Sequence, residues 1–189
     1  MSTRGRTKAT LIEAASRLFR SRGYHGVGVN AVIAEAGAPA GSLYFHFPGG
    51  KQQLAAAAVR LAGERISAAI RTAATEDPRI ALHEYFRGLG AELQRSGWES
   101  GCPIATVTLD VASDSPEVQA SCADAYGTWR DALADGLRKA GVDDRLAEER
   151  AITLLAATQG ALILARAWQT TEPLEVVASQ LEGLVPAGG

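Results

Sequence analysis

The sequence has 189 residues, of which 47% are hydrophobic and 21% charged, a composition typical of an ordinary globular protein. It excludes a largely disordered chain, and two cysteines cannot frame a small disulfide scaffold. Eight basic and two acidic residues give residues 1–60 a charge of +6, so the rest carries −8 of the total of −2. A basic front segment suits contact with a polyanion, although such a charge run is often only a solvated face.

The start of the chain is polar and basic, without the apolar stretch of a secretory signal, which predicts a cytoplasmic protein. Its longest uncharged stretch, residues 151–165, is shorter than the roughly 20 residues that span a bilayer, so we expect a buried helix there and no membrane partner. Cys102 and Cys122 lack the spacing of zinc or redox motifs and are interpreted as packing residues.

Three helices are predicted at the front of the chain. Leu11, Ala15 and Phe19 belong to an apolar stripe that predicts a helix over residues 7–22, ended by Gly23. A second, short helix is expected over residues 29–36 and ends at Gly37.

The third helix is expected to begin with Pro39 at its first position and to reach Phe47. Leu43 and Phe47 then face the first two helices, and the outward positions are Gly41, Ser42, Phe45 and His46. Two short helices joined by a tight, glycine-containing turn behind a longer helix are typical of a helix-turn-helix.

Later helix starts are marked by a capping residue followed by proline at Asp77-Pro78, Ser115-Pro116 and Glu172-Pro173, and by Asp143 or Asp144. Together with the break at residues 48–50, these signals predict helices over residues 51–74, 79–96, 103–111, 116–140, 145–169 and 173–184. We therefore expect an all-α protein of about nine helices without a sheet.

Motifs for other chemistry are weak. Residues 26–31 contain GxGxxA, but a helix rather than a strand precedes them, so a flexible turn is favoured over a dinucleotide site. The three histidines are isolated, and we expect no metal site, no cofactor and no catalytic residues. An all-helical enzyme using scattered groups such as His83, Asp110 and Tyr126 stays open as an alternative.

The third helix offers a physical basis for binding DNA. Free N–H groups near Gly41 and Ser42 can bind a phosphate, and Ser42 can also reach a base edge. Phe45 can contact a thymine methyl group, while Tyr44 and His46 can donate to phosphates.

At these residues the sequence resembles the TetR family of bacterial transcriptional repressors. The resemblance covers about 50 residues and rests on Leu18-Phe19, Gly23-Tyr24, Ala36-Gly37, residues 41–47 and Lys51. The connection over residues 47–51 and Gly101-Cys102-Pro103 resemble the LmrA-type branch, which contains lincomycin-resistance and flavonoid-responsive repressors. Gly28 and Ala40 depart from the family, which commonly has a hydroxyl and a basic residue there, so operator binding could be weaker or shifted.

The resemblance implies a DNA-binding domain over residues 1–51 and a helical ligand-binding and dimerisation domain over residues 52–189. The expected DNA-binding residues are Arg6, Asn30, Pro39, Ala40, Gly41, Ser42, Tyr44, Phe45, His46 and Lys51. Apolar and aromatic residues with sparse polar groups, expected to line a ligand pocket although each could equally be core, are Phe86, Trp98, Cys102, Ile104, Thr108, Tyr126, Trp129, Thr158, Gln159 and Leu162. The expected dimer interface comprises Ala157, Gly160, Ala161, Leu164, Trp168, Val177, Leu181 and Leu184, with packing inside the chain as the alternative.

The sequence thus predicts a repressor that binds a palindromic double-stranded DNA operator as a homodimer and is released by a small, largely apolar or aromatic effector. The helix beginning at Lys51 is expected to link the two domains. A DNA-binding regulator without a physiological ligand is the alternative within the same class.

Overall fold

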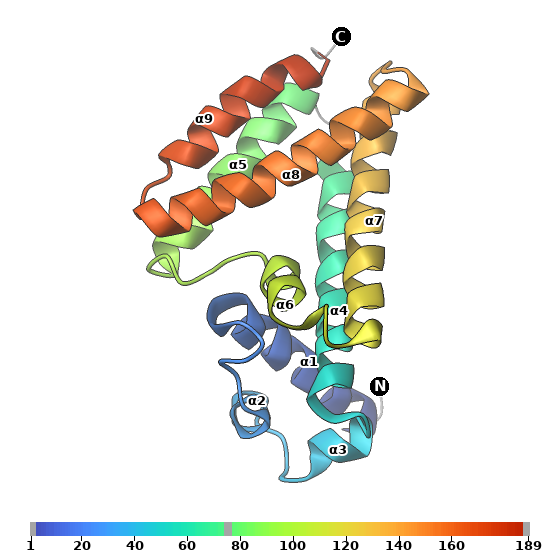
Figure 1. The fold of residues 1–189 in the computed structure, drawn as a ribbon, viewed down its shortest axis with the longest axis vertical. Coiled ribbons are helices and arrows are strands. Elements are labelled where there is room, and N and C mark those ends of the chain that lie inside the picture. Colours follow the sequence, from blue (N-terminus) through green and yellow to red (C-terminus); the bar gives the residue numbers. More distant parts are fainter. Residues whose placement is uncertain (1–2, 74–76, 187–189) are drawn as a thin grey trace. The chain divides into compact units, whose positions relative to one another are not determined.

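A computed structural model describes residues 3–73 and 77–186, and this part of the chain consists of helices and loops without a strand (Figure 1). The elements over these residues are α1 (Thr3–Arg22), α2 (Val29–Glu35), α3 (Ser42–His46), α4 (Gly50–Ala73), α5 (Pro78–Arg95), α6 (Pro103–Val111), α7 (Pro116–Lys139), α8 (Asp144–Trp168), α9 (Glu172–Leu181) and the 3₁₀ turn η1 (Glu182–Leu184). The predicted all-α class with about nine helices is confirmed.

The capping residues explain why most helices begin where the sequence predicts. Asp77 Oδ1 accepts hydrogen bonds from the backbone N–H groups of Arg79 and Ile80, at 2.8 and 3.2 Å. Asp143 Oδ1 caps α8 in the same way. Each carboxylate thereby satisfies N–H groups that have no partner inside the helix.

Two predicted helix starts are wrong by three or more residues, and the first is that of α1, which begins at Thr3 and not at residue 7. α3 begins at Ser42 and not at Pro39, because Gly41 precedes it with φ +82° and the Ser42 N–H closes a turn on the Pro39 carbonyl at 3.1 Å. Only glycine adopts such a φ without strain, so the turn ends at this position and the helix follows it. α9 begins at Glu172 with Thr171 as its N-cap, one residue before the predicted start.

The contacts divide the chain into two compact units. The first unit comprises Met1–Glu64 and Cys102–Tyr126, and the second comprises Arg65–Gly101 and Gly127–Gly189. The first unit therefore contains α6 and the start of α7 as well as the three N-terminal helices, and α4 and α7 each contribute residues to both units.

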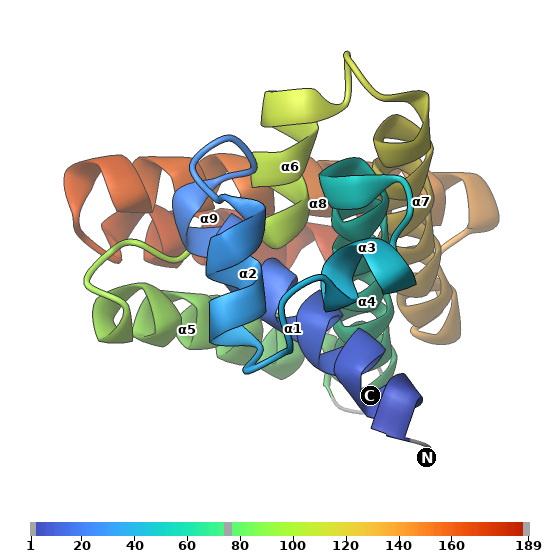
Figure 2. The ribbon, with the colours of Figure 1, turned by 90° about the horizontal axis from the view of Figure 1, so that it is seen from below.

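The core of the first unit forms around α1, which contacts α2, α3 and α6; α2 and α3 are seen from below in Figure 2. Leu11 and Phe19 of α1, Val32 of α2, and Leu43 and Phe47 around α3 are all buried. The inward stripe predicted for these helices is therefore the one that the structure buries, and it holds the short α2 and α3 on α1.

In the second unit α5, α8 and α9 pack on one another (Figure 1). A Cβ atom added at Gly90 of α5 would lie 3.0 Å from Thr171 Cγ2, so glycine permits this close approach. By length and composition alone α8 could cross a membrane, a test that the core helix of a soluble protein also passes. α8 buries one side of its surface against its neighbours, including Leu154, Thr158 and Ala165.

Candidate functional site

The turn before α3 and α3 itself form an exposed surface on the first unit. Tyr44 and Phe45 are 59% and 68% exposed, and Pro39, Ala40 and Gly41 beside them are exposed too. Because Leu43 and Phe47 on the opposite side of α3 are buried, this helix is anchored while its aromatic side chains remain free to contact another molecule.

The three N-terminal helices, α1, α2 and α3, also carry polar side chains that could contact DNA. Arg6 of α1 and Asn30 of α2 are exposed, and His46 is half-buried with its ring 5.0 Å from that of Phe45, edge to face. The Ser42 hydroxyl differs from its neighbours, because its oxygen is buried and makes no hydrogen bond within the described residues. The Ser42 hydroxyl is therefore not presented at this surface, and its backbone N–H bonds to the Pro39 carbonyl.

Lys51 lies at the start of α4, with Nζ 4.1 Å from the centroid of the Tyr24 ring. Burial lowers the pKa of Lys51, and the negative charge of Asp110 opposes that shift. A second cation that the sequence did not single out is Lys8, whose Nζ lies 5.7 Å from the centroid of the Phe47 ring. The sequence offered only its position as a clue, because Lys8 is a basic residue on the first helix close to the buried stripe.

The second unit contains a cavity of about 770 Å³ between four helices. Its wall is mainly apolar and includes three aromatic rings. The lining side chains come from the end of α4, the first half of α5, the second half of α7 and the middle of α8, and include Ala69, Ile70, Ala73, Leu82, Tyr85, Phe86, Trp129, Leu133, Leu137, Leu154, Leu155 and Thr158. Polar groups are few, and the Thr158 hydroxyl already donates to the Leu154 carbonyl at 2.7 Å.

Three of the ten residues predicted to line a pocket, Phe86, Trp129 and Thr158, lie together in this wall. The remaining predicted residues of the second unit are outside the wall: Trp98, Gln159 and Leu162. The residues that belong to the first unit instead are Cys102, Ile104, Thr108 and Tyr126. The sequence analysis missed Tyr85, Leu133, Leu137 and Leu155, whose available signal was their spacing on the apolar faces of consecutive helices.

In the first unit, the phenol of Tyr126 and the thiol of Cys122 are both held in their neutral, protonated forms. Burial raises the pKa of the Tyr126 phenol, and the Cys102 and Cys122 thiols raise it further. Burial also raises the pKa of Cys122, which keeps its thiol protonated and poorly nucleophilic. Neither cysteine forms a disulfide and both are buried, as packing residues would be.

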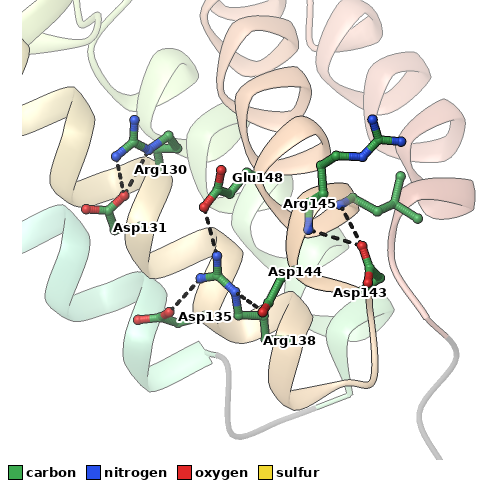
Figure 3. A network of polar contacts seen from close by, with 9 residues as sticks. Arg130, Asp131, Asp135, Arg138, Asp143, Asp144, Arg145 and Glu148 are labelled. Atoms are coloured by element: carbon green, nitrogen blue, oxygen red, sulfur yellow. Dashed lines mark hydrogen bonds and ion pairs between the residues drawn. The ribbon is translucent and has the colours of Figure 1, made fainter.

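An ionic network holds the turn between α7 and α8 beside the cavity (Figure 3). Arg138 bonds to Asp135 at 3.0 Å, to Asp144 at 2.9 Å and to Glu148 at 3.1 Å, joining the end of α7 to the start of α8. Lys139, Ala140 and Gly141, which follow Arg138, line the cavity. The network therefore fixes one wall of the cavity through the backbone.

An apolar stripe on α8 faces away from the rest of the second unit. Ile152, Gly160, Ile163, Leu164 and Trp168 are exposed at helical spacing. Gly160, Leu164 and Trp168 were predicted at an interface, whereas Ile152 and Ile163 were not. Of the other predicted interface residues, Ala161 and Leu181 are buried within the chain, and the half-buried ones are Ala157, Val177 and Leu184.

The described residues contain no group of three or more His, Cys, Asp or Glu side chains that could hold a metal ion. His83 Nε2 lies 2.6 Å from Glu182 Oε1 in the second unit, whereas Asp110 and Tyr126 belong to the first. The three residues considered as scattered catalytic groups are therefore divided between the two units.

Comparison with known families gives two matches. Residues 11–64 match the family of bacterial regulatory proteins named after tetR, and residues 78–180 match the C-terminal domain described as that of LmrA/YxaF-like transcriptional regulators. The predicted resemblance, including the LmrA-type branch, is confirmed.

Characterised and uncharacterised relatives cover nearly the whole chain. The HTH-type transcriptional regulator LmrA of Bacillus subtilis is 31% identical over 183 residues, 96% of this chain and 97% of the relative. An uncharacterized HTH-type transcriptional regulator of Mycobacterium tuberculosis is 32% identical over 182 residues, 94% of this chain and 93% of the relative.

Solved structures share the fold. The reduced form of NemR from E. coli superposes with a TM-score of 0.83 at 18% identity, covering 96% of this chain and 99% of that one. A TetR transcriptional regulator from Legionella pneumophila gives a TM-score of 0.81 at 18% identity, covering 98% of each chain. The order of helices, with the helix-turn-helix first and the helical second half after it, is thus shared with these structures.

Proposed function

Since this chain belongs to the TetR family of transcriptional regulators, we propose that it is a repressor that binds a palindromic operator as a homodimer and is released by a small, largely apolar effector. The family consists of DNA-binding regulators and not of enzymes. The observation that carries the proposal is the pairing of an exposed, aromatic α3 with a mainly apolar cavity in the same chain.

The surface around α3 supports DNA recognition. Phe45 is available for apolar contact with a thymine methyl group, and Tyr44 and His46 for hydrogen bonds to phosphates. Arg6, Asn30 and the exposed backbone of Gly41 add contacts on either side. Lys51 contributes positive charge from its place on the Tyr24 ring.

The exposed apolar stripe of α8 supports a homodimer in which α8 and α9 of two copies form a four-helix interface. A partner helix, and not lipid, then covers Ile163, Leu164 and Trp168, in keeping with a cytoplasmic protein. Two-fold symmetry places two α3 helices about 34–36 Å apart in successive major grooves, so the operator is a near palindrome.

The cavity supports a neutral or weakly polar aromatic effector. Its volume of about 770 Å³ falls within the range of drug-sized ligand sites, and Tyr85, Phe86 and Trp129 supply aromatic walls. Release from DNA requires the effector to prefer a dimer with a different spacing of its two α3 helices. α4 is a direct connection, since Lys51 lies at its start and Ile70 lines the cavity near its end.

Selection from a random duplex library at about 0.1 M salt tests the proposal, because phosphate contacts make binding salt-sensitive. We expect the full chain to enrich a palindrome, the Tyr44→Ala variant to lose it, and Tyr85→Ala to retain it. Tyr85→Ala is a matched control, since it removes the same side chain from the second unit. If the folded, dimeric protein enriches no sequence, the proposal is wrong.

A further inference from the structure

One face of α6 is bonded to the end of α1 and to the turn that follows it. Thr106 and Asp110, one helical turn apart on α6, provide the side chains. The Thr106 hydroxyl donates to the Phe19 carbonyl at 3.0 Å. Asp110 Oδ2 accepts from the backbone N–H of Tyr24 at 2.6 Å and from that of His25 at 3.4 Å.

The backbone of this turn is shaped to receive the carboxylate. Gly23 has φ +69°, and the two N–H groups that follow it converge on one oxygen, forming a small anion-binding concavity. A Cβ atom at Gly23 would lie 2.6 Å from Asp110 Oδ2. Glycine is therefore needed both for the conformation and for the space that the carboxylate occupies.

The same turn also holds residues that face α4 and α6. The buried ring of Tyr24 packs on Phe19, with centroids 5.6 Å apart, and Lys51 Nζ lies against its face. His25 Nε2 lies 2.9 Å from the Asp110 carbonyl oxygen at the end of α6. Asp110 thus contacts the turn through its side chain and through its backbone carbonyl. Tyr24, whose N–H bonds to Asp110, also contacts Lys51 through its ring.

We infer that Asp110 is a positioning residue for DNA recognition, which holds the turn between α1 and α2 so that α2 and α3 present one fixed surface. The inference rests on the proposed function, because it concerns operator affinity. The turn ends at Gly28, the N-cap of α2, so a change in its path moves the start of α2 directly. Nothing in the sequence pattern predicts this contact, since Asp110 lies 86 positions from Tyr24.

The first test compares Asp110→Ala with Asp114→Ala in the full chain. Asp114 is a matched control, because it is an exposed aspartate four residues further on that accepts from its neighbour Ser113. We expect Asp110→Ala to weaken binding to the selected operator by about tenfold or more, within the usual span of coupling between sites. Amide exchange at Tyr24 and His25, followed by NMR, should accelerate in Asp110→Ala and stay unchanged in Asp114→Ala.

A conservative variant separates positioning from general stability. Asp110→Asn keeps one oxygen that can accept from both N–H groups but removes the charge, so we expect its operator affinity to lie between wild type and Asp110→Ala. An Asp110→Ala protein with a lower melting temperature but wild-type operator affinity would overturn the inference. So would amide exchange at Tyr24 and His25 equal to that of the wild type.

Gly23→Ala perturbs the contact from the other side and serves if Asp110→Ala does not fold. Its control is Gly97→Ala, since Gly97 has a similar φ of +60° with open space around its Cβ position. We expect Gly23→Ala to weaken operator binding and Gly97→Ala to leave it unchanged. Equal affinities of the two variants would contradict the inference, whereas a wild-type protein that enriches no operator would instead refute the proposed function.

Discussion

At the scale of the residue, Phe45 can be tested without disturbing the fold, because its side chain is exposed while Leu43 and Phe47 hold α3 in place. We expect Phe45→Ala to weaken binding to the selected operator by about 5-fold to 150-fold, the range of one lost base contact, and to leave binding to scrambled DNA unchanged. Fluorescence anisotropy with both duplexes measures this. Leu109→Ala is the control, since Leu109 is an exposed apolar residue of the same unit; a loss of both affinities would contradict base contact.

The sequence predicts individual residues well where the signal is local. Leu43 and Phe47 are buried as their spacing indicates, and Phe45 is exposed. The buried hydroxyl of Ser42 was not foreseeable, because it follows from the turn set by Gly41. The contact of Asp110 with Tyr24 was not foreseeable either, since it joins residues far apart in the chain.

At the scale of the element, the turn between α7 and α8 depends on charge. Arg138 bonds to three carboxylates there (Figure 3), and its removal leaves these three negative charges close together without a cation between them. We expect Arg138→Ala to lower the melting temperature by a few degrees at low salt and by less at about 1 M salt, which screens exposed charges. Arg130→Ala, which removes an arginine bonded to its neighbour Asp131, should have a smaller effect. Equal melting temperatures at low salt would show that the network is dispensable.

α8 is the element on which the dimer depends. We expect Ile163→Glu to give a folded monomer, because a charge placed in the apolar stripe would be buried without a partner. Ile80→Glu is the control, since Ile80 is similarly exposed on α5. Light scattering after size exclusion measures the mass, and a dimeric Ile163→Glu protein would place the interface elsewhere.

Helix boundaries were largely predictable because the signals that set them lie within a few residues. Asp77, Asp143 and the following prolines or backbone N–H groups define helix starts locally, and the observed starts agree with the expected ones within a residue. Two starts depart further. α1 begins four residues early, at Thr3. α3 begins late, because glycine in the left-handed region overrides the signal from Pro39. The cavity wall was only partly predictable, because it depends on which faces of four helices meet.

At the scale of the whole molecule, effector binding and operator binding should be linked by one free energy. α4 carries Lys51 at its start and cavity residues near its end, so a ligand that alters the cavity wall acts on a helix that also reaches the first unit. We expect a neutral aromatic effector to reduce operator affinity by about 5-fold to 150-fold. By reciprocity, saturating operator should weaken effector binding by the same factor, which titrations with and without DNA can compare.

Filling the cavity should abolish effector binding while leaving operator binding intact. We expect Leu133→Trp to occupy part of the cavity, to abolish binding of the neutral fluorescent probe N-phenylnaphthylamine and to leave operator affinity at the wild-type level. Leu146→Trp is the control, since Leu146 is a partly exposed residue of α8 outside the cavity wall. An effector found by screening should release operator from wild type and from Leu146→Trp but not from Leu133→Trp. Release from all three proteins would mean that the effector acts at another site and that the cavity does not control DNA binding.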